Sequence, residues 1–281
     1  MLSGHSVPDL SGLVAGSTFD LHKDAAGVAW DFTKPSDRKR AWGRLRAEEP
    51  FLVVGSPPCT MFSRLQLSLN AKKMGKAEWE KRRREAEVLL VFAAAVYAFQ
   101  VQNGRHFLHE HPAGATSWHH PSIARLYARQ DVDVVVSHMC QFGMRTSDEG
   151  GDRAWARKPT RFISFSPAVL EAFSRKCRGG HAHAPLRGGT RARDAAVYPP
   201  DLCEAIAQGA AEQLRRDDLA HGLQSLRTGR GASSTEVHCG ETQGRTRDED
   251  EELAAWPAAA VYDEITGTEL PPDLVKQARA E

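Results

Sequence analysis

A cysteine stands directly after two prolines in the stretch Gly55-Ser56-Pro57-Pro58-Cys59-Thr60-Met61-Phe62-Ser63. An apolar run, residues 51–54, precedes the stretch and is typical of a short buried strand. Two consecutive prolines end a strand and fix a rigid turn. The turn would present the Cys59 thiol at the C-terminal end of a strand, where α/β sheets place their chemistry. The alternative is a turn with a cysteine that only packs, and a bare Pro-Pro-Cys would favour that alternative.

The whole nine-residue stretch resembles the catalytic loop of DNA cytosine-5 methyltransferases, in which a Pro-Cys pair precedes a short segment ending in Phe-Ser. Later segments resemble that family's further motifs in the same order. They are His106–Pro112 for the Glu-Asn-Val strand end, Cys140–Met144 with Arg157–Ile163 for the Tyr-Gly-x-Pro-Gln-Arg-x-Arg block, and Arg191–Ala207 for the Asn-x-Val-Pro-Pro turn that opens a helix. A Gly- and Asp-rich insertion, residues 146–156, interrupts the second of these, and Ala195 stands where the third usually has Asn.

The resemblance implies roles for particular residues. The Cys59 thiolate would attack C6 of a flipped-out cytosine, and Glu110 would hydrogen-bond the base at N3 and its exocyclic amine. Arg161, or Arg157, would hold the carbonyl oxygen of the base. A nearby cation or helix N-terminus should lower the pKa of Cys59, because the thiolate is the nucleophile. The residues expected to bind or shape the site for the base are Phe62, Ser63 and Gln141.

The resemblance also implies S-adenosylmethionine as the methyl donor, but the family's first motif has no match. That motif is a strand followed by the loop Asp-x-Phe-x-Gly-x-Gly-Gly. We interpret residues 19–21 and 28–32 as the remnant of a second strand and the end of a third, which would place Asp20 and Asp31 at the ribose and adenine. Pro57 and Pro58 complete the candidate cofactor contacts. For each acid alone, an ordinary turn or capping residue is the favoured alternative.

Periodicity along the chain predicts alternating strands and helices. The predicted strands are 51–54, 106–109, 132–137 and 161–165, and the predicted helices are 36–47, 76–102, 122–130 and 201–214. This alternation predicts an α/β fold with a mainly parallel sheet and helices on both faces. It agrees with a Rossmann-like methyltransferase fold whose first strand-loop unit is missing.

The charge is uneven although the net charge is only +1. Residues 153–193 contain ten Lys and Arg residues and one acid, Glu171. A basic face of this kind neutralises phosphates, so we expect a nucleic-acid partner, DNA in view of the resemblance. A solvated, Arg-rich loop is the alternative.

The chain also carries signals about its surroundings. No apolar run approaches the roughly 18 residues that span a bilayer, so no membrane partner is expected. A secretory signal is not recognisable, and five scattered cysteines do not indicate a disulfide framework. We therefore expect an intracellular protein, nuclear or cytoplasmic. The oligomeric state is left open.

Composition changes along the chain predict three parts. Residues 1–216 would form the methyltransferase-like domain, and residues 217–252 a disordered linker with an acidic run. Residues 253–281 resemble the segment that leads into the reverse-transcriptase region of Copia-type retrotransposon polyproteins. That second resemblance implies a piece of a mobile-element polyprotein.

A further constellation is Cys177-x3-His181-x-His183. With Cys140 or Cys203 as a fourth ligand, it could hold a structural zinc ion. The spacing is not that of a standard zinc finger, so a polar loop with incidental histidines is favoured and no metal is expected.

Three hypotheses follow. The first is an active cytosine-5 methyltransferase, which the retained Cys59, Glu110 and Arg161 favour. The second is a degenerate methyltransferase fold that binds nucleic acid without methylating it, which the missing glycine loop favours. The third is an amino-methyltransferase, because Ser56-Pro57-Pro58 is similar to the loop of that class, although an aromatic residue is then expected where Cys59 stands.

Overall fold

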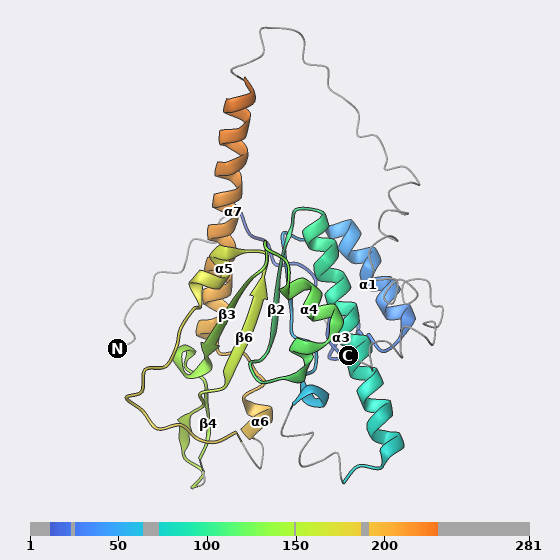
Figure 1. The fold of residues 1–281 in the computed structure, drawn as a ribbon, viewed down its shortest axis with the longest axis vertical. Coiled ribbons are helices and arrows are strands. Elements are labelled where there is room, and N and C mark those ends of the chain that lie inside the picture. The colour runs from blue at the N-terminus through green and yellow to red at the C-terminus, as the bar shows by residue number, and fades with distance from the viewer. Residues whose placement is uncertain (1–11, 24–25, 64–72, 149, 187–190, 230–281) are drawn as a thin grey trace. The chain divides into compact units, whose positions relative to one another are not determined.

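Four strands form the central sheet in a computed structural model of the chain (Figure 1), which describes residues 12–23, 26–63, 73–148, 150–186 and 191–229. The strand order is β1 (Leu52–Gly55), β2 (His106–Pro112), β6 (Pro159–Ser164) and β3 (Asp133–His138). Strands β1 and β2 pair in parallel, whereas β6 is antiparallel to both β2 and β3. Strands β1, β2 and β3 therefore run in one direction and β6 runs in the other.

The structure has the predicted mixed α/β class. It differs from the predicted mainly parallel sheet in β6, the strand predicted at 161–165, which is antiparallel to both of its neighbours. The chain between β3 and β6 forms the short helix η3 (Met139–Phe142) and the hairpin of β4 (Arg145–Ser147) and β5 (Arg153–Trp155). A parallel neighbour needs a crossover, usually a long helix. The chain instead returns beside β3 in the opposite direction. The predicted insertion at 146–156 thus contains this hairpin except for Arg145, its first residue.

Helices cover both faces of the sheet (Figure 1). One face carries α3 (Lys76–Gln102) and α4 (Pro121–Tyr127), with α1 (Pro35–Glu48) packed against α3. The other face carries α5 (Pro167–Ala172) and the first part of α7 (Pro200–Gly229). The short elements are η1 (Thr60–Phe62), η2 (Thr116–His119) and α6 (Arg191–Asp194).

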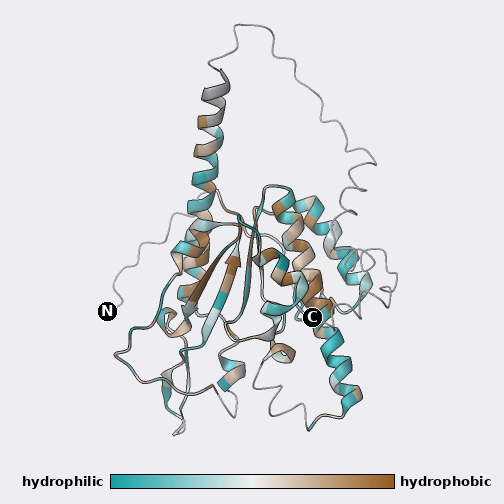
Figure 2. Ribbon diagram, viewed as in Figure 1, coloured by the Kyte–Doolittle hydropathy of each residue, from teal (hydrophilic) through white to brown (hydrophobic). Residues whose placement is uncertain are grey.

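Side chains of β2 alternate between the two faces, as the pleat of a strand requires. Phe107 stacks on Tyr97 of α3 with ring centroids 4.8 Å apart. Leu108 points the other way, into a core that includes Val169 of α5 and Leu202 of α7. Figure 2 shows the apolar colouring concentrated in the strands and in the helix segments that cover them. This alternation decides which polar residues of β2 meet.

Helix α3 changes character along its length (Figure 2). Its first turns are charged and carry the ion pairs Arg82–Glu78 and Arg83–Glu87, each 2.7 Å long, while its buried residues lie between Ala86 and Gln100. By length and composition α3 could cross a membrane, but half of its most apolar 18-residue window is buried within the fold. That burial is what the core helix of a folded domain shows.

The chain divides into two units, Met1–Gln213 and Leu214–Glu281. The described part of the second unit is the remainder of α7, which continues past the predicted end at 214 to Gly229. The acidic run and the polyprotein-like tail lie outside the described residues.

Residues 19–21 and 28–32, interpreted as strand remnants, are not strands in the structure. A backbone hydrogen bond of 2.8 Å from Trp30 N to Asp20 O joins the two segments. Their aromatic side chains pack together and onto α3, with Phe32 and Phe92 4.7 Å apart. Packing against a helix, rather than pairing in the sheet, therefore orders this part of the chain.

Two helical glycines give a matched test of this packing. A Cβ atom at Gly209 of α7 would lie 2.6 Å from Val169 Cα and 3.0 Å from Ala168 O, whereas one at exposed Gly43 of α1 would meet nothing within 4 Å. We expect Gly209→Ala to destabilise the fold by about 1–3 kcal/mol through overpacking. Gly43→Ala should stabilise it by up to about 1 kcal/mol through helix propensity. Thermal unfolding measures both changes, and shifts of the same sign would contradict this packing.

Candidate functional site

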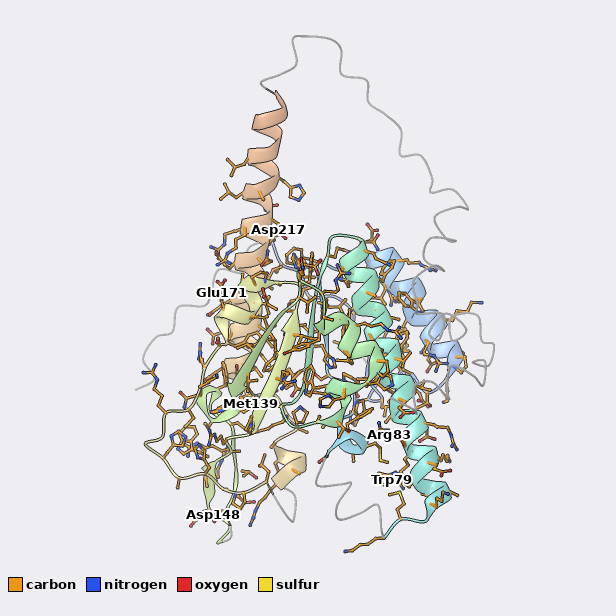
Figure 3. The ribbon with its side chains drawn as sticks, in the orientation of Figure 1. Trp79, Arg83, Met139, Asp148, Glu171 and Asp217 are labelled. Atoms are coloured by element: carbon orange, nitrogen blue, oxygen red, sulfur yellow. The ribbon has the colours of Figure 1, made fainter. Side chains whose placement is uncertain are left out.

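The Cys59 loop is held by hydrogen bonds from two other elements. His111 Nε2 of β2 donates to the Pro57 carbonyl oxygen at 2.7 Å, and Arg83 of α3, labelled in Figure 3, donates to the Met61 carbonyl oxygen at 2.9 Å. Two fixed carbonyl groups, one on each side, therefore set the position of Cys59.

His111 is suited to this role because it is neutral. Burial lowers its pKa to about 4. Its Nδ1 lies 2.5 Å from the Ser117 hydroxyl and can accept from it, which leaves the proton on Nε2 to donate to Pro57. The fully buried Phe62 ring packs near the His111 ring. The guanidinium carbon of Arg83 lies 4.5 Å from the centroid of the Phe62 ring. Phe62 therefore fixes the loop as a core residue.

The end of β1 lies directly against α3. A Cβ atom at Gly55 would stand 1.9 Å from the Tyr97 hydroxyl oxygen. Tyr97 is buried, and its hydroxyl lies 3.2 Å from His109 Nδ1. Only glycine lets the backbone approach this closely, and the loop that begins at Ser56 starts from that contact.

Glu110 is the central polar group of the site. Its residue surface is 6% exposed, and its Oε1 lies 3.6 Å from Lys158 Nζ without accepting a hydrogen bond from any described residue. Burial raises the pKa of Glu110, while Lys158 and the hydroxyls of Tyr198 and Ser56 oppose that rise. The Ser56 and Tyr198 hydroxyls also hydrogen-bond each other. Each of the four stretches that resemble family motifs, 55–63, 106–112, 157–163 and 191–207, thus contributes a residue to this site.

Lys158 reaches Glu110 from a strained backbone. Its φ is +24°, which residues other than glycine rarely adopt, and Pro159 follows it. The Met139 N–H donates to the Arg157 carbonyl at 2.8 Å and lies 3.4 Å from that of Lys158. Strain of this kind persists where the surroundings impose it, and it is often found at functional sites.

The Cys59 thiol lies within the electrostatic range of this pair. Burial raises its pKa, the Glu110 charge raises it further, and Lys158 opposes both. The expected lowering of the Cys59 pKa is therefore wrong for this state of the protein. The thiol is the resting form, and Lys158 is the cation that favours the thiolate.

Arg161 and Arg157 do not join the site in the structure. Arg161 is opposite His111 in the register of β6 with β2, and Phe162 is opposite Glu110. Directly opposite residues share a face, so Arg161 points to the α4 side, where its guanidinium lies 5.0 Å from the Trp118 ring centroid. Arg157 is exposed, and its Nε lies 3.4 Å from His138 Nδ1.

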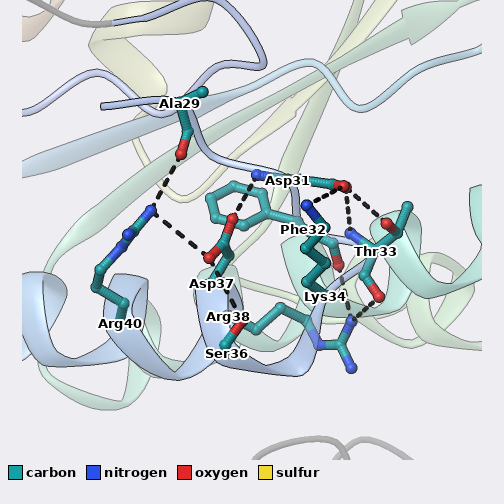
Figure 4. Close-up of polar contacts among 9 residues, drawn as sticks. All are labelled: Ala29, Asp31, Phe32, Thr33, Lys34, Ser36, Asp37, Arg38 and Arg40. Atoms are coloured by element: carbon teal, nitrogen blue, oxygen red, sulfur yellow. Dashed lines mark hydrogen bonds and ion pairs between the residues drawn. The ribbon is translucent and has the colours of Figure 1, made fainter. Parts of the chain in front are cut away.

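The two acids expected to contact the cofactor make local hydrogen bonds, as Figure 4 shows for Asp31. Asp31 accepts hydrogen bonds from the Thr33 hydroxyl at 2.6 Å and backbone N–H at 3.1 Å, and forms an ion pair with Lys34 at 3.4 Å. The Thr33 hydroxyl lowers the pKa of Asp31. Asp20 accepts from the His22 N–H at 2.8 Å. Both acids thus form the turns that the alternative interpretation describes.

The remaining candidates are placed as follows. Ser63 is half-buried at the end of η1, Pro57 is half-buried and Pro58 is exposed. Gln141 is half-buried in η3, where its side chain lies beside Cys140. One group in the described part of the chain has the composition of a metal site: Cys140, Cys177, His181 and His183.

Sequence reasoning missed Lys158, Tyr198 and Ser56 as site residues. All three lie within the motif segments, and Ser56 and Lys158 stand directly beside the candidates Pro57 and Arg157. The family motif has an arginine two residues after its proline, which corresponds to Arg161, and it directs attention to arginines rather than to Lys158. Lys158 directly precedes β6 and lies an even number of positions before Phe162, which is opposite Glu110, so Lys158 and not Arg161 is on the Glu110 side of the sheet.

Comparisons of the chain with protein-family models, with curated proteins and with solved structures find no match.

Charges around Cys59 predict how fast its thiol is alkylated. Below the thiol pKa, the rate follows the thiolate fraction, which changes tenfold per pKa unit. Glu110→Gln removes a negative charge and should speed iodoacetamide modification of Cys59 at pH 8 severalfold. Lys158→Gln removes a positive charge and should slow it. Peptide mass spectrometry follows Cys59 against exposed Cys203 as the internal control. Equal or same-direction changes would show that packing, not charge, controls the thiol.

Proposed function

We propose that this chain is a DNA cytosine-5 methyltransferase-like domain that acts on a cytosine base through Cys59. The observation that supports it most is that a loop cysteine lies within the electrostatic range of a buried carboxyl group and its lysine partner, at the carboxyl ends of two adjacent parallel strands. Open α/β sheets bind ligands at these ends. A cytosine ring in contact with all three groups would have C6 near Cys59 and N3 near Glu110.

The protonation states fit the addition of a thiol to that ring. The Cys59 thiol releases its proton to solvent, and the thiolate forms the S–C6 bond. The π electrons of the 5,6 double bond shift through the ring while N3 takes the proton of the Glu110 carboxyl. Burial raises the pKa of Glu110, so its carboxyl takes up and passes on a proton more readily than an exposed one, and Lys158 stabilises the carboxylate that remains after the transfer. The neutral adduct carries a nucleophilic C5.

The sheet supports the same proposal. Strands β1, β2 and β3 run parallel, and β6 is inserted between β2 and β3 in the opposite direction. The resemblance implies a sheet in which most strands run in one direction, and three of the four strands of the described sheet do so. β1 is an edge strand of the described sheet. The described strands are therefore β1, which leads into the Cys59 loop, and the strands that follow this loop in the chain.

The described residues do not fit S-adenosylmethionine. Asp20 and Asp31 are engaged in local turns, and no strand precedes β1 among residues 12–23 and 26–51. We therefore derive no methyl-transfer step from this chain. The chemistry that its own residues support is reversible addition to cytosine.

A second candidate is a nucleic-acid-binding module without chemistry. The raised pKa of Cys59 favours it, and so do exposed cations in the basic segment. These exposed cations are Arg153, Arg157, Arg175, Lys176 and Arg178. Phosphate contacts of this kind give affinity that falls steeply with salt.

Hydrogen exchange at C5 of cytosine tests the proposed chemistry without any methyl donor. In the adduct, C5 can take deuterium from D2O, and reversal then returns cytosine labelled at C5. Incubation with a single-stranded oligonucleotide avoids the cost of flipping the base out of a duplex. We expect wild type to accelerate exchange, Cys59→Ser to abolish it, and Glu110→Gln to slow it by about 10²–10⁴-fold.

Cys203→Ser is the matched control, because Cys203 is exposed on α7, and it should exchange like wild type. If wild type binds the oligonucleotide but gives no exchange above background, the binding module is the correct function. Exchange retained in Cys59→Ser would remove Cys59 from the chemistry.

A further inference from the structure

Four potential metal ligands converge beyond the carboxyl end of β3. Cys140 lies on η3, and Cys177, His181 and His183 follow α5 in the chain. Their ligand atoms all lie within 4.8 Å of one another. We propose that Cys140, Cys177, His181 and His183 bind one structural Zn²⁺ ion.

The distances between the ligand atoms agree with tetrahedral coordination. Cys177 Sγ lies 3.6 Å from His181 Nε2 and 3.6 Å from His183 Nε2. Zinc bonds of about 2.3 Å to sulfur and about 2.05 Å to nitrogen, at the tetrahedral angle, separate the two ligand atoms by about 3.6 Å. Two thiolates balance the charge of Zn²⁺, and a closed set of two Cys and two His ligands is typical of structural zinc.

Groups around the ligands support a bound metal. The Gly179 N–H donates to Cys177 Sγ at 3.4 Å, and the Gln141 amide lies 3.9 Å from Cys140 Sγ. Gly179 and Gly180 have φ of +97° and +85°, which lets the chain fold back between Cys177 and His181. Donors to the ligand sulfurs orient and stabilise thiolates in metal sites.

The metal-free arrangement leaves a problem that zinc resolves. Cys140 is 3% exposed, and its sulfur is one of four ligand atoms that lie within 4.8 Å of one another. Two thiols and two imidazoles then face one another, and the described group of four contains no carboxylate. Zinc displaces the thiol protons and converts this contact into four bonds. The competing possibility is a Cys140–Cys177 disulfide.

The cluster is connected to the candidate site. The His183 backbone forms a bridge with Trp155 of β5, and the Ala184 N–H donates to the Trp155 carbonyl at 2.9 Å. β5 leads to Arg157 and Lys158, whose carbonyls lie next to the N–H of Met139 (labelled in Figure 3), the residue before Cys140. Zinc would therefore fasten the segment from which Lys158 reaches Glu110.

Metal analysis of the full chain tests the proposal. Protein purified under reducing conditions without chelator should carry about one zinc per chain. Replacement with Co²⁺ should give the visible absorption of tetrahedral cobalt and a sulfur-to-cobalt charge-transfer band. Stripping the metal should raise the number of thiols that react with a thiol reagent by two, for Cys140 and Cys177.

The same cysteine-to-serine change at two positions separates this site from chance binding. Cys177→Ser should lower the zinc content at least tenfold and remove the charge-transfer band, whereas Cys203→Ser should keep both. His183→Ala gives the same loss from a different ligand type. If these variants do not fold, the cobalt spectrum of wild type decides. Absence of that spectrum, full zinc content in Cys177→Ser, or a Cys140–Cys177 disulfide in the purified protein would overturn the proposal.

Discussion

A carboxyl group buried near the end of a central strand constrains everything around it. Glu110 is 6% exposed, and removing a carboxylate from water costs several kcal/mol unless partners replace the water. Lys158, Ser56 and Tyr198 are those partners, and each comes from a different segment. The Cys59 loop leaves β1, the direct neighbour of β2, so the thiol enters the field of this group. One buried charge thus holds together segments that lie far apart in the chain.

Much of the fold could be predicted from the sequence, because long periodic segments decide it. Helix α3 has the predicted bounds. β1, which precedes the Cys59 loop, is shifted by one residue from the prediction, and β2, which contains Glu110, begins as predicted and ends three residues later. The reversed direction of β6 was not predictable from a pattern of apolar residues, since that pattern does not encode direction. The direction depends on a short hairpin, β4–β5, in a segment whose Gly and Asp content indicated only an insertion.

The sequence likewise predicts some residues of the candidate site and not others. Cys59 and Glu110 could be placed together because the carboxyl ends of neighbouring parallel strands meet at one edge of the sheet. The cation of the site, Lys158, could not be predicted. Its position depends on a strand register in which Arg161 is opposite His111, and on the unusual backbone conformation of Lys158 itself. Cys140 could not be chosen over Cys203 as the partner of Cys177 either, since that choice depends on how η3 folds back toward the loop after α5. Asp20 and Asp31 were predicted to contact a cofactor but form local turns. Aspartate is common in turns, so its position in the sequence does not indicate a cofactor site.

The most direct measurement is a covalent complex between Cys59 and a base. A single-stranded oligonucleotide with 2-pyrimidinone in place of one cytosine offers a C6 that accepts a thiol without the exocyclic amine, so no methyl donor is needed. Intact mass spectrometry should show wild type plus one oligonucleotide, with peptide mapping to Cys59. The same experiment with Cys59→Ser should show protein alone. A complex that maps to Cys203, or no complex with wild type at any concentration at which the oligonucleotide binds, would contradict the assignment of Cys59, Glu110 and Lys158 to one site.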